Sequence, residues 1–226
     1  MKSILRVPSF AKINWRLKIL GQRHDGYHEL RTIYQTIDLR DHIAFETRTS
    51  GVIDLDIQGR KVAEGEDNLL YRTAVLLKQE TGCRRGVKMN LDKKIPVGGG
   101  LGGGSSNSAV ALMVLNQIWE CHLTQNELGE LAVQLGSDVP FFLTGGTALG
   151  IGRGEKVLPL PDVFEDEPLL LLYPGLEIPT KEAYSLGQWK PCEAVPGILT
   201  KHEFNTTIRR LREAANQAVE EWTLLD

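Results

Sequence analysis

A glycine-rich segment, IPVGGGLGGGSSNSAV from Ile95 to Val110, limits the folds open to this chain more than any other stretch. Six of the seven residues from Gly98 to Gly104 are glycine, and each costs about 0.5–1 kcal/mol relative to alanine inside a regular element. The residues before it alternate like a strand, and the apolar residues after it predict a buried helix. Residues 105–107, Ser-Ser-Asn, favour a helix N-cap. The segment therefore predicts a strand, a glycine loop and a helix N-terminus, an arrangement that binds phosphate.

Other interpretations of this glycine pattern are weaker. Gly98, Gly100 and Gly103 also match G-x-G-x-x-G, but that dinucleotide fingerprint requires an acidic residue at the end of the next strand. Glu120 has about the right spacing, yet it follows the helix directly. The P-loop pattern is excluded because no glycine of the loop is followed by Lys and then Ser or Thr. A flexible linker would not be flanked by two apolar elements.

The composition fits a globular chain without a nucleic-acid or membrane partner. Of 226 residues, 42% are hydrophobic and 24% are charged, and the formal net charge of −3 gives no basic surface for nucleic acid. The longest apolar runs, Ala109–Leu115 and Leu169–Tyr173, are too short to span a bilayer. Cys83, Cys121 and Cys192 are odd in number and widely spaced. We therefore expect reduced thiols in a cytoplasmic protein.

The first half of the chain is rich in strand-type patterns. They cover Ser3–Leu20, Ile33–Arg48 and Gly51–Arg60, and Pro8 marks an edge or a bend in the first of them. Helical spacing of apolar residues over Asn68–Gly82 predicts a helix that ends at its final glycine. These predicted strands and this helix all precede the glycine loop in the sequence.

A third helix has clear sequence signals at both ends. Thr124 and Glu127 form a capping box at its start, and Gly136 ends it. Asp138 is therefore expected on a short loop just beyond this helix. The glycine-rich residues from Thr144 to Glu155 then predict a hairpin.

A change in composition near residues 155–165 predicts a domain boundary. Prolines and an acidic run, DVFEDEP, gather in and after this region. We expect one domain over residues 1–160 and a second over residues 161–226. The run PLLLLYPG, Pro168–Gly175, predicts a buried strand that opens the second domain, and Phe204–Asp226 predicts a helix with solvated charges.

Three motifs carry a resemblance to a known family. They are Pro96 with the glycine loop and its serines, AKINWRLKILGQRHDGYHEL at Ala11–Leu30, and LGSDVPFFLTGGTALGIGRGE at Leu135–Glu155. From about Ser9 to about Tyr184 the chain resembles the GHMP kinases, and more narrowly those acting on a cytidyl diphosphate substrate in the non-mevalonate (MEP) isoprenoid pathway. The resemblance implies an α+β fold. Its parts are an N-terminal ATP-binding domain like domain 2 of ribosomal protein S5 and a C-terminal α/β substrate domain.

The reaction implied by this resemblance moves the γ-phosphate of ATP, bound with Mg²⁺, to a tertiary hydroxyl. Asp138 matches the catalytic aspartate that accepts the hydroxyl proton. Lys12 matches the catalytic lysine, which holds Asp138 ionised. Asn14 lies two residues beyond Lys12, on the same face of a strand, and is expected to orient the hydroxyl. Taken singly, such a lysine is usually a solvated charge and such an aspartate a turn former, so these roles rest on the joint match.

The resemblance also implies contacts to both substrates. For ATP these are Pro96, Val97, Gly98, Gly99, Gly100, Leu101, Gly102, Gly103, Gly104, Ser105 and Ser106, with Asn68 and Lys93 on the adenine side. For the cytosine ring they are Tyr27, His28, Thr180 and Tyr184. The family often has Phe at the last position, and a half-buried core tyrosine is the alternative for Tyr184. No ligand for a metal is assigned, since the His28–Glu29 pair lacks the second histidine of H-E-x-x-H.

The C-terminal part departs from the family pattern. Members carry a second glycine-rich motif there, whereas this sequence has only Gly175, Gly187 and Gly197 after Gly154. We therefore expect an incomplete second domain and an impaired chain, working as a monomer or a weak homodimer. A truncated copy or a nucleotide-binding pseudokinase is the main alternative to an active kinase. A GHMP enzyme with another acceptor is disfavoured by the GYH motif and by Tyr184.

Overall fold

The computed structural model describes residues 4–162 and 168–175, which all belong to the first of two compact units of the chain. These units are Met1–Pro191 and Cys192–Asp226. The helix predicted at the C-terminus lies outside the described residues, and the division into domains at residue 160 stays a prediction.

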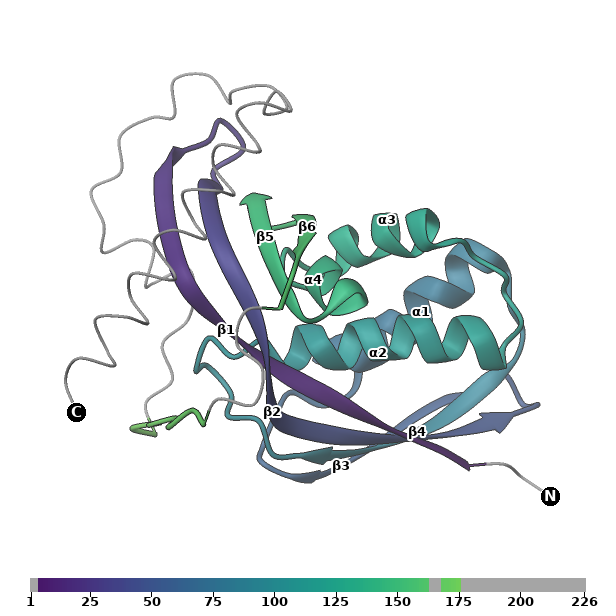
Figure 1. The fold of residues 1–226 in the computed structure, drawn as a ribbon. Helices are drawn as coiled ribbons and strands as arrows, with labels where there is room; N and C mark the ends of the chain where they lie inside the picture. The colour runs from purple at the N-terminus through teal and green to yellow at the C-terminus, as the bar shows by residue number, and fades with distance from the viewer. Residues whose placement is uncertain (1–3, 163–167, 176–226) are drawn as a thin grey trace. The chain divides into compact units, whose positions relative to one another are not determined.

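Groups of strands and helices follow one another along the described chain (Figure 1). In order they are β1 (Ile4–Gln22), β2 (His28–Arg48), β3 (Ile53–Gly59), the 3-10 helix η1 (Gly65–Asp67), α1 (Leu69–Thr81), β4 (Gly86–Lys93), α2 (Gly103–Ile118), α3 (Gln125–Leu135), α4 (Val139–Thr144), β5 (Thr147–Gly152) and β6 (Lys156–Leu160). This order confirms the predicted α+β class.

The six strands form one sheet that is organised around β2. One side of β2 pairs with β1 along nearly its whole length. The other side pairs with β4 through residues 42–48 and with β5 through residues 30–35. The β3–β4 pair is parallel and the other pairs are antiparallel. In the described part of the chain β1 pairs with β2 alone, so Pro8 lies in an edge strand, as predicted.

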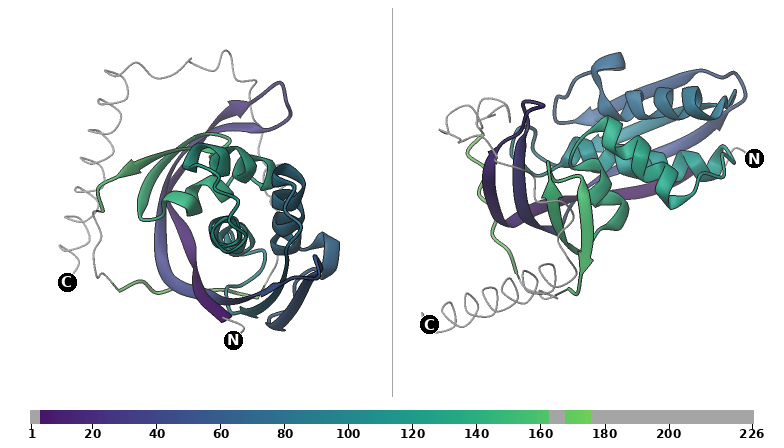
Figure 2. Two further views of the ribbon diagram at one scale, coloured as in Figure 1. Left: turned by 90° about the vertical axis from the view of Figure 1, so that its right-hand side faces the viewer. Right: turned by 90° about the horizontal axis from the view of Figure 1, so that it is seen from above.

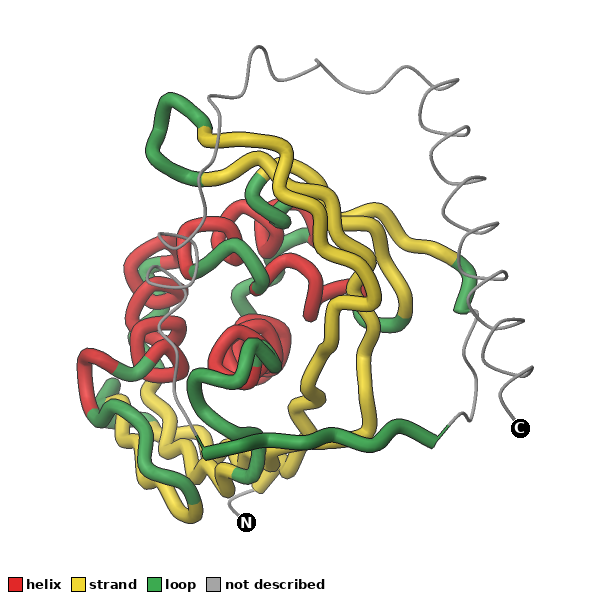
Figure 3. Tube along the Cα trace, turned by 90° about the vertical axis from the view of Figure 1, so that its left-hand side faces the viewer, coloured by secondary structure: helices red, strands yellow, loops and turns green. Residues whose placement is uncertain are grey.

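Helix α2 is the centre of the core. Figures 2 and 3 show it end-on, between the curved sheet and the other helices. It contacts α1, α3, α4, β1 and β2. Its residues 106–112 and 114–115 are buried, including Leu112 and Leu115 at 0% exposure. A helix that is apolar all round must be covered on every side, and this confirms the predicted buried helix.

Most predicted element boundaries are confirmed. Helix α1 ends before Gly82, which has a left-handed φ of 66°. Helix α3 begins with the capping box of Thr124 and Glu127, and both of its hydrogen bonds are present. β5 and β6 form the predicted glycine-rich hairpin.

Two helix starts differ from the prediction. The N-cap of α2 is Gly102 at φ 67°, without a side-chain capping bond, so residues 105–107 lie inside the first turns. The chain must turn with a positive φ there, and glycine allows this at low cost. Asp138 is the N-cap of the short helix α4 rather than a residue of an open loop.

The buried strand predicted at Pro168–Gly175 is wrong. Residues 168–175 form no strand, and Leu170 and Leu172 are 84% and 82% exposed. A continuous apolar run becomes a buried strand only where neighbouring strands and faces cover it. Among the described strands none pairs with this run. Its Tyr173 instead donates a hydrogen bond to the Val97 carbonyl oxygen at 3.0 Å.

Candidate active site

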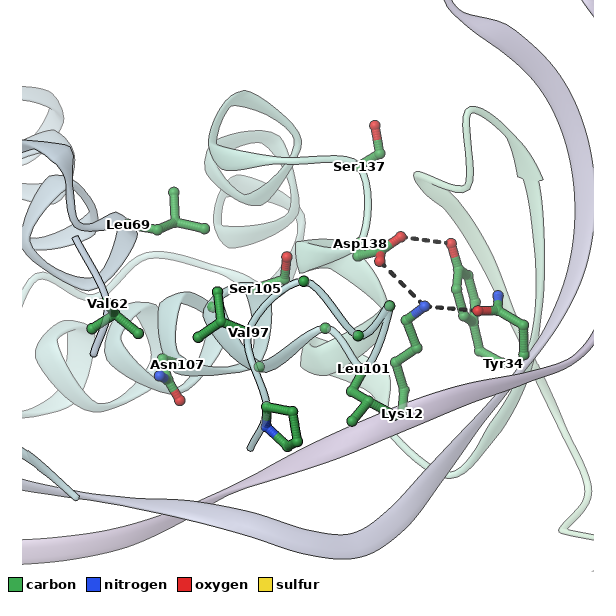
Figure 4. Close-up of a pocket in the computed structure, with 18 of the residues that line it drawn as sticks. Lys12, Tyr34, Val62, Leu69, Val97, Leu101, Ser105, Asn107, Ser137 and Asp138 are labelled. Atoms are coloured by element: carbon green, nitrogen blue, oxygen red, sulfur yellow. Dashed lines mark hydrogen bonds and ion pairs between the residues drawn. The ribbon is translucent and has the colours of Figure 1, made fainter. Parts of the chain in front are cut away.

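A cavity of about 1690 Å³ brings most of the predicted site residues together (Figure 4). They are Lys12, Asn14, Tyr27, His28, Asn68, Lys93, Pro96–Ser105 and Asp138. Single-ligand pockets usually enclose about 300–1,000 Å³, so this space is large enough for a nucleotide and a second substrate. Ser106 does not line the cavity, and its hydroxyl accepts a hydrogen bond from Ser9. Thr180 and Tyr184 lie outside the described residues.

Lys12 and Asp138 form an ion pair at one end of this cavity. Lys12 Nζ lies 3.5 Å from Asp138 Oδ2 and donates a 2.7 Å hydrogen bond to Asn14 Oδ1. Lys12 is 4% exposed, whereas the Asp138 side chain is 34% exposed. The cation is therefore fixed by its surroundings while the carboxylate remains open to a ligand in the cavity.

The pairing of β1 with β2 explains why Lys12, Asn14 and Tyr34 lie close together. Lys12 is opposite Thr36 and Asn14 is opposite Tyr34, and an extra residue, Trp15, follows before the next pair. Cross-strand partners in an antiparallel pair project from the same face. The Lys12 N–H also donates to the Leu101 carbonyl oxygen at 3.0 Å, which fastens β1 to the glycine loop.

The oxygen and the nitrogen of the Asn14 side-chain amide each form a hydrogen bond within the site. Its Oδ1 accepts from Lys12, and its Nδ2 donates to Thr32 Oγ1 at 2.6 Å. Asn14 therefore holds the Lys12 ammonium toward Asp138.

The glycine loop has the conformation of an anion-binding turn. Gly98, Gly100 and Gly102 have φ values of 69°, 69° and 67°, a region that L side chains rarely adopt. The first N–H groups of α2 follow at once, and the Gly102 N-cap supplies no side-chain capping bond. Unpaired N–H groups at a helix start carry a partial positive charge that attracts phosphate.

Two glycines of the loop are needed for packing against the protein itself. A Cβ on Gly102 would lie 2.7 Å from Phe142 Cζ, and a Cβ on Gly103 would lie 2.8 Å from Lys93 Nζ. Gly104 differs, because a Cβ there would meet no atom within 4 Å. A Cβ on Gly100 would also meet nothing within 4 Å, but its φ of 69° disfavours a side chain, so Gly104 is the better position at which to place a side chain in open space.

Lys93 and Asn68 hold the structure around the loop. Lys93 is paired with Asp41 at 2.6 Å and also donates to the Ile95 carbonyl oxygen. Burial lowers the pKa of the Lys93 ammonium, and the hydrogen bond and charge of Asp41 oppose this shift. Asn68 is the N-cap of α1 and accepts from the Leu70 N–H at 2.9 Å.

Tyr27 and His28 also line the cavity, and they lie where β2 begins. The Tyr27 N–H donates to Asp25 Oδ1 at 3.1 Å, which shapes the turn before β2. The Tyr27 ring is accessible at 52% exposure, and the Arg153 guanidinium carbon lies 4.4 Å from its centroid. An aromatic ring with a cation on one face is well suited to stack on a flat ligand.

The sequence did not point to three residues that the structure places at this site. Tyr34 contacts Asp138 and Asp41 pairs with Lys93, while Tyr173 binds the start of the glycine loop. Each acts across a long sequence separation, so no local spacing reveals it. Tyr34 is the cross-strand partner of Asn14, whereas Thr32 is opposite Leu17 beyond the extra residue Trp15, and this register cannot be read from the sequence of either strand.

Neither a metal cluster nor a membrane span is found in residues 4–162 and 168–175. No group of three or more His, Cys, Asp or Glu side chains there could hold a metal ion. No helix in these ranges has the length and apolar character needed to cross a bilayer.

Comparison with known families relates this site to small-molecule kinases. A family model described as the GHMP kinases N terminal domain matches residues 68–146. A 4-diphosphocytidyl-2-C-methyl-D-erythritol kinase from Prochlorococcus marinus (strain MIT 9312) is 41% identical over 213 residues, which are 94% of this chain and 68% of that relative. The same enzyme from Histophilus somni (strain 2336) is 49% identical over 153 residues, 68% of this chain and 49% of the relative. The chain thus spans about half to two thirds of the length of these relatives.

Solved structures give the same relationship. A crystal structure of 4-(cytidine 5'-diphospho)-2C-methyl-D-erythritol kinase aligns with a TM-score of 0.64 and 37% identity, over 80% of this chain and 63% of that one. Homoserine kinase from Cytophaga hutchinsonii aligns with a TM-score of 0.58 at 16% identity, over 89% of this chain and 65% of that one. The second likeness concerns the fold alone, and it agrees with the GHMP kinase fold that the sequence predicts.

Proposed function

The chain belongs to the 4-diphosphocytidyl-2-C-methyl-D-erythritol kinase family, and we propose that it transfers the γ-phosphate of ATP to the 2-hydroxyl of 4-diphosphocytidyl-2-C-methyl-D-erythritol in the MEP pathway. The observation that carries this proposal is the Lys12–Asp138 ion pair, 3.5 Å long, in the same cavity as the glycine loop. Phosphoryl transfer needs a phosphate cradle, a cation and a carboxylate near the attacking hydroxyl. All three line this one space.

The glycine loop and the first turn of α2 bind the phosphates of ATP. Positive φ values at Gly98, Gly100 and Gly102 turn the backbone around this point. The dipole of a 16-residue helix adds to the attraction. Pro96 to Ser105 then form the cradle, and Asn68 and Lys93 support its adenine side.

Asp138 and Lys12 carry out the transfer step. The substrate O–H bond breaks as its proton passes to the Asp138 carboxylate, and the hydroxyl oxygen forms the new bond to the γ-phosphorus. The bond from this phosphorus to its bridging oxygen breaks, and ADP leaves with the electron pair. Lys12 stabilises the negative charge that develops on the transferred group, and Asn14 keeps its ammonium in place.

Mg²⁺ would enter this site with ATP. Magnesium is usually held by one or two protein ligands plus substrate phosphates, and Ser105, whose hydroxyl is a loop oxygen lining the same cavity, is the residue that would help to hold it. When bound, the ion would neutralise negative charge on the phosphates of ATP.

The cytidyl group of the substrate binds at the Tyr27 end of the cavity. The exposed Tyr27 ring offers a stacking face, and Arg153 beside it offers a positive charge for the diphosphate. His28 lines the same space, and Thr180 and Tyr184 are the further contacts proposed. In this scheme residues 1–160 form the ATP-binding and catalytic domain and residues 161–226 form part of the substrate domain.

The setting proposed for this reaction is the cytoplasm. The net charge of −3 and the widely spaced cysteines support a cytoplasmic enzyme without a nucleic-acid partner. We propose that it acts as a monomer or a weak homodimer.

A coupled assay of ADP formation tests the proposed function. The chain is incubated with ATP, Mg²⁺ and the cytidyl substrate, and homoserine and mevalonate serve as control acceptors. ADP formation that depends on the cytidyl substrate is the expected result. ATP binding without any ADP formation would indicate a nucleotide-binding pseudokinase, and ADP formation with a control acceptor alone would reject the proposed substrate.

A further inference from the structure

Tyr34 of β2 contacts the carboxylate of Asp138 but has no part in the scheme above. Its hydroxyl donates a 3.0 Å hydrogen bond to Asp138 Oδ1, while Asp138 Oδ2 faces Lys12 Nζ at 3.5 Å. The two oxygens of one carboxylate thus have different partners, as Figure 4 shows. A donor that holds one oxygen of a carboxylate fixes the orientation of the whole group. The other oxygen then stays available for the reaction.

The surrounding chain leaves a slot for the Tyr34 side chain. A Cβ on Gly150 would lie 2.5 Å from Tyr34 Cε2, and a Cβ on Gly154 would overlap the Tyr34 hydroxyl oxygen. Both glycines belong to the β5–β6 hairpin and its turn. The ring stacks on Phe141 of α4 with 4.7 Å between centroids, and Tyr34 is 2% exposed. The hydroxyl is therefore fixed in position relative to the helix that begins at Asp138.

Asp138 does not use its carboxylate as N-cap residues usually do. An aspartate at this position normally accepts a hydrogen bond from an N–H of the first helical turn. The Asp138 side chain makes no such capping bond to α4. Its carboxylate instead turns toward Lys12 and Tyr34, so these two residues replace the helix as its partners.

We propose that Tyr34 is a positioning residue for Asp138. Its hydroxyl holds Oδ1 and so orients the carboxylate that accepts the substrate proton. A general base must be held within reach of the proton that it accepts, by neighbours that fix its orientation. This inference rests on the proposed phosphoryl transfer with Asp138 as the base.

Other titratable groups surround Asp138 without contacting its carboxylate. In the cavity these are Asp25, Tyr27, His28, Asp67, Lys93, Arg153 and Tyr173, and the neighbouring hairpin and α3 add Glu155, Lys156, Glu127 and Glu130. Helices α2 and α4 and strand β5 contain no charged residue. Within the described ranges, Lys12 and Tyr34 are the side chains that contact the Asp138 carboxylate.

The variant Tyr34→Phe tests this role, because it keeps the ring and its slot and removes only the donor. We expect kcat to fall about tenfold, because the carboxylate loses the donor that orients it, while KM for the cytidyl substrate and ATP affinity stay unchanged. The matched control is Tyr71→Phe on α1, which removes a tyrosine hydroxyl that does not line the cavity. It should leave kcat and KM as they are.

A second measurement and a second variant keep the test decisive. Carbon-13 NMR at one fixed pH should show a changed chemical shift of the Asp138 carboxyl carbon in Tyr34→Phe, whether or not turnover is measurable. Should Tyr34→Phe fail to fold, 3-fluorotyrosine at position 34 keeps the ring and donates a stronger hydrogen bond. It should also change the chemical shift of the Asp138 carboxyl carbon.

The variant Asp138→Asn distinguishes a failure of the role proposed for Tyr34 from a failure of the proposed reaction. An inactive Asp138→Asn variant together with an unchanged kcat and an unchanged Asp138 carboxyl resonance in Tyr34→Phe would overturn the role of Tyr34 alone. Wild-type turnover in Asp138→Asn would overturn the proposed reaction at this site, and the role of Tyr34 with it.

Discussion

Lys93 Nζ and Asp41 Oδ2 lie 2.6 Å apart in a buried ion pair next to Gly103. The other oxygen of Asp41 accepts the N–H groups of Lys94 and Ile95 at 2.7 and 2.8 Å. The end of β4 is thus fastened to β2 just before the glycine loop begins. Lys93 is committed to this structural pair, although it also lines the cavity.

Replacing Lys93 with Met should destabilise the fold strongly. The change leaves the Asp41 carboxylate buried without its cation, which costs about 3–5 kcal/mol of the free energy of unfolding. Lys88→Met on the same strand is the matched control, since its 2.7 Å pair with Asp56 is solvent-exposed and such pairs contribute little. Urea unfolding of both variants checks this. Equal losses of unfolding free energy in the two variants would show that the burial of the Lys93–Asp41 pair does not matter for stability.

Gly104→Ala should weaken ATP binding without harming the fold. Its Cβ enters open space at the start of α2, on the cavity side, where a phosphate would approach. Losing one hydrogen bond to a charged phosphate lowers affinity about tenfold or more. The control is Gly129→Ala in α3, where a Cβ also meets nothing within 4 Å. Calorimetric titration with ATP measures the difference, and unchanged affinity in folded Gly104→Ala would mean that the loop does not bind phosphate.

Gly103→Val is a less suitable probe of phosphate binding than Gly104→Ala. Its Cβ would meet Lys93 Nζ and Ile95 Cγ2, at 2.8 and 2.9 Å, before it affected a ligand. Any loss of ATP affinity in that variant would therefore report on protein packing.

Asp138→Asn and Lys12→Met should each lower kcat by about 10²–10⁴-fold while ATP affinity stays nearly constant. Both groups act chiefly in the transition state, and interactions made there affect turnover more than ground-state binding. Lys18→Met is the control, because Lys18 is an exposed lysine of the same strand. Steady-state kinetics and ATP titration provide the two measurements. Near wild-type turnover would reject the role of whichever residue was changed.

Selectivity for cytosine should depend on the Tyr27 ring. Tyr27→Ala removes the stacking face and should cost about 1 kcal/mol or more of substrate binding, whereas Tyr27→Phe keeps the ring and most of the affinity. Inhibition assays on the unchanged chain should show competition by CDP but not by UDP. Equal inhibition by the two nucleotides would mean that this end of the cavity does not recognise the base.

Local signals explain the parts of the fold that the sequence predicts well. The capping box of Thr124 and Glu127, the stop at Gly82 and the glycine loop each involve residues a few positions apart. Their physics is contained in one turn or one helix end, so it can be recognised without knowing the tertiary structure. Lys12 and Asp138 were found differently, through the resemblance of whole motifs, and the structure places them 3.5 Å apart.

Non-local contacts explain what the sequence does not predict. Tyr34 and Asp138 are 104 positions apart, and their contact depends on the packing of α4 against β2, where Phe141 stacks on Tyr34. The exposure of Leu170 and Leu172 likewise depends on what covers that run, which hydrophobicity alone does not specify.

The irregular pairing of β1 also affects how this protein behaves toward other copies of itself. A long, flat edge strand would offer its free N–H and C=O groups to a strand of a second molecule and so promote aggregation. β1 has 19 residues, but its register with β2 shifts between Phe10 and Ala11, between Asn14 and Arg16, and between Ile19 and Gly21. Such bulges bend and twist an edge so that another strand cannot extend along it. The shift that follows Lys12 and Asn14 in the site therefore also protects the chain against edge-to-edge association.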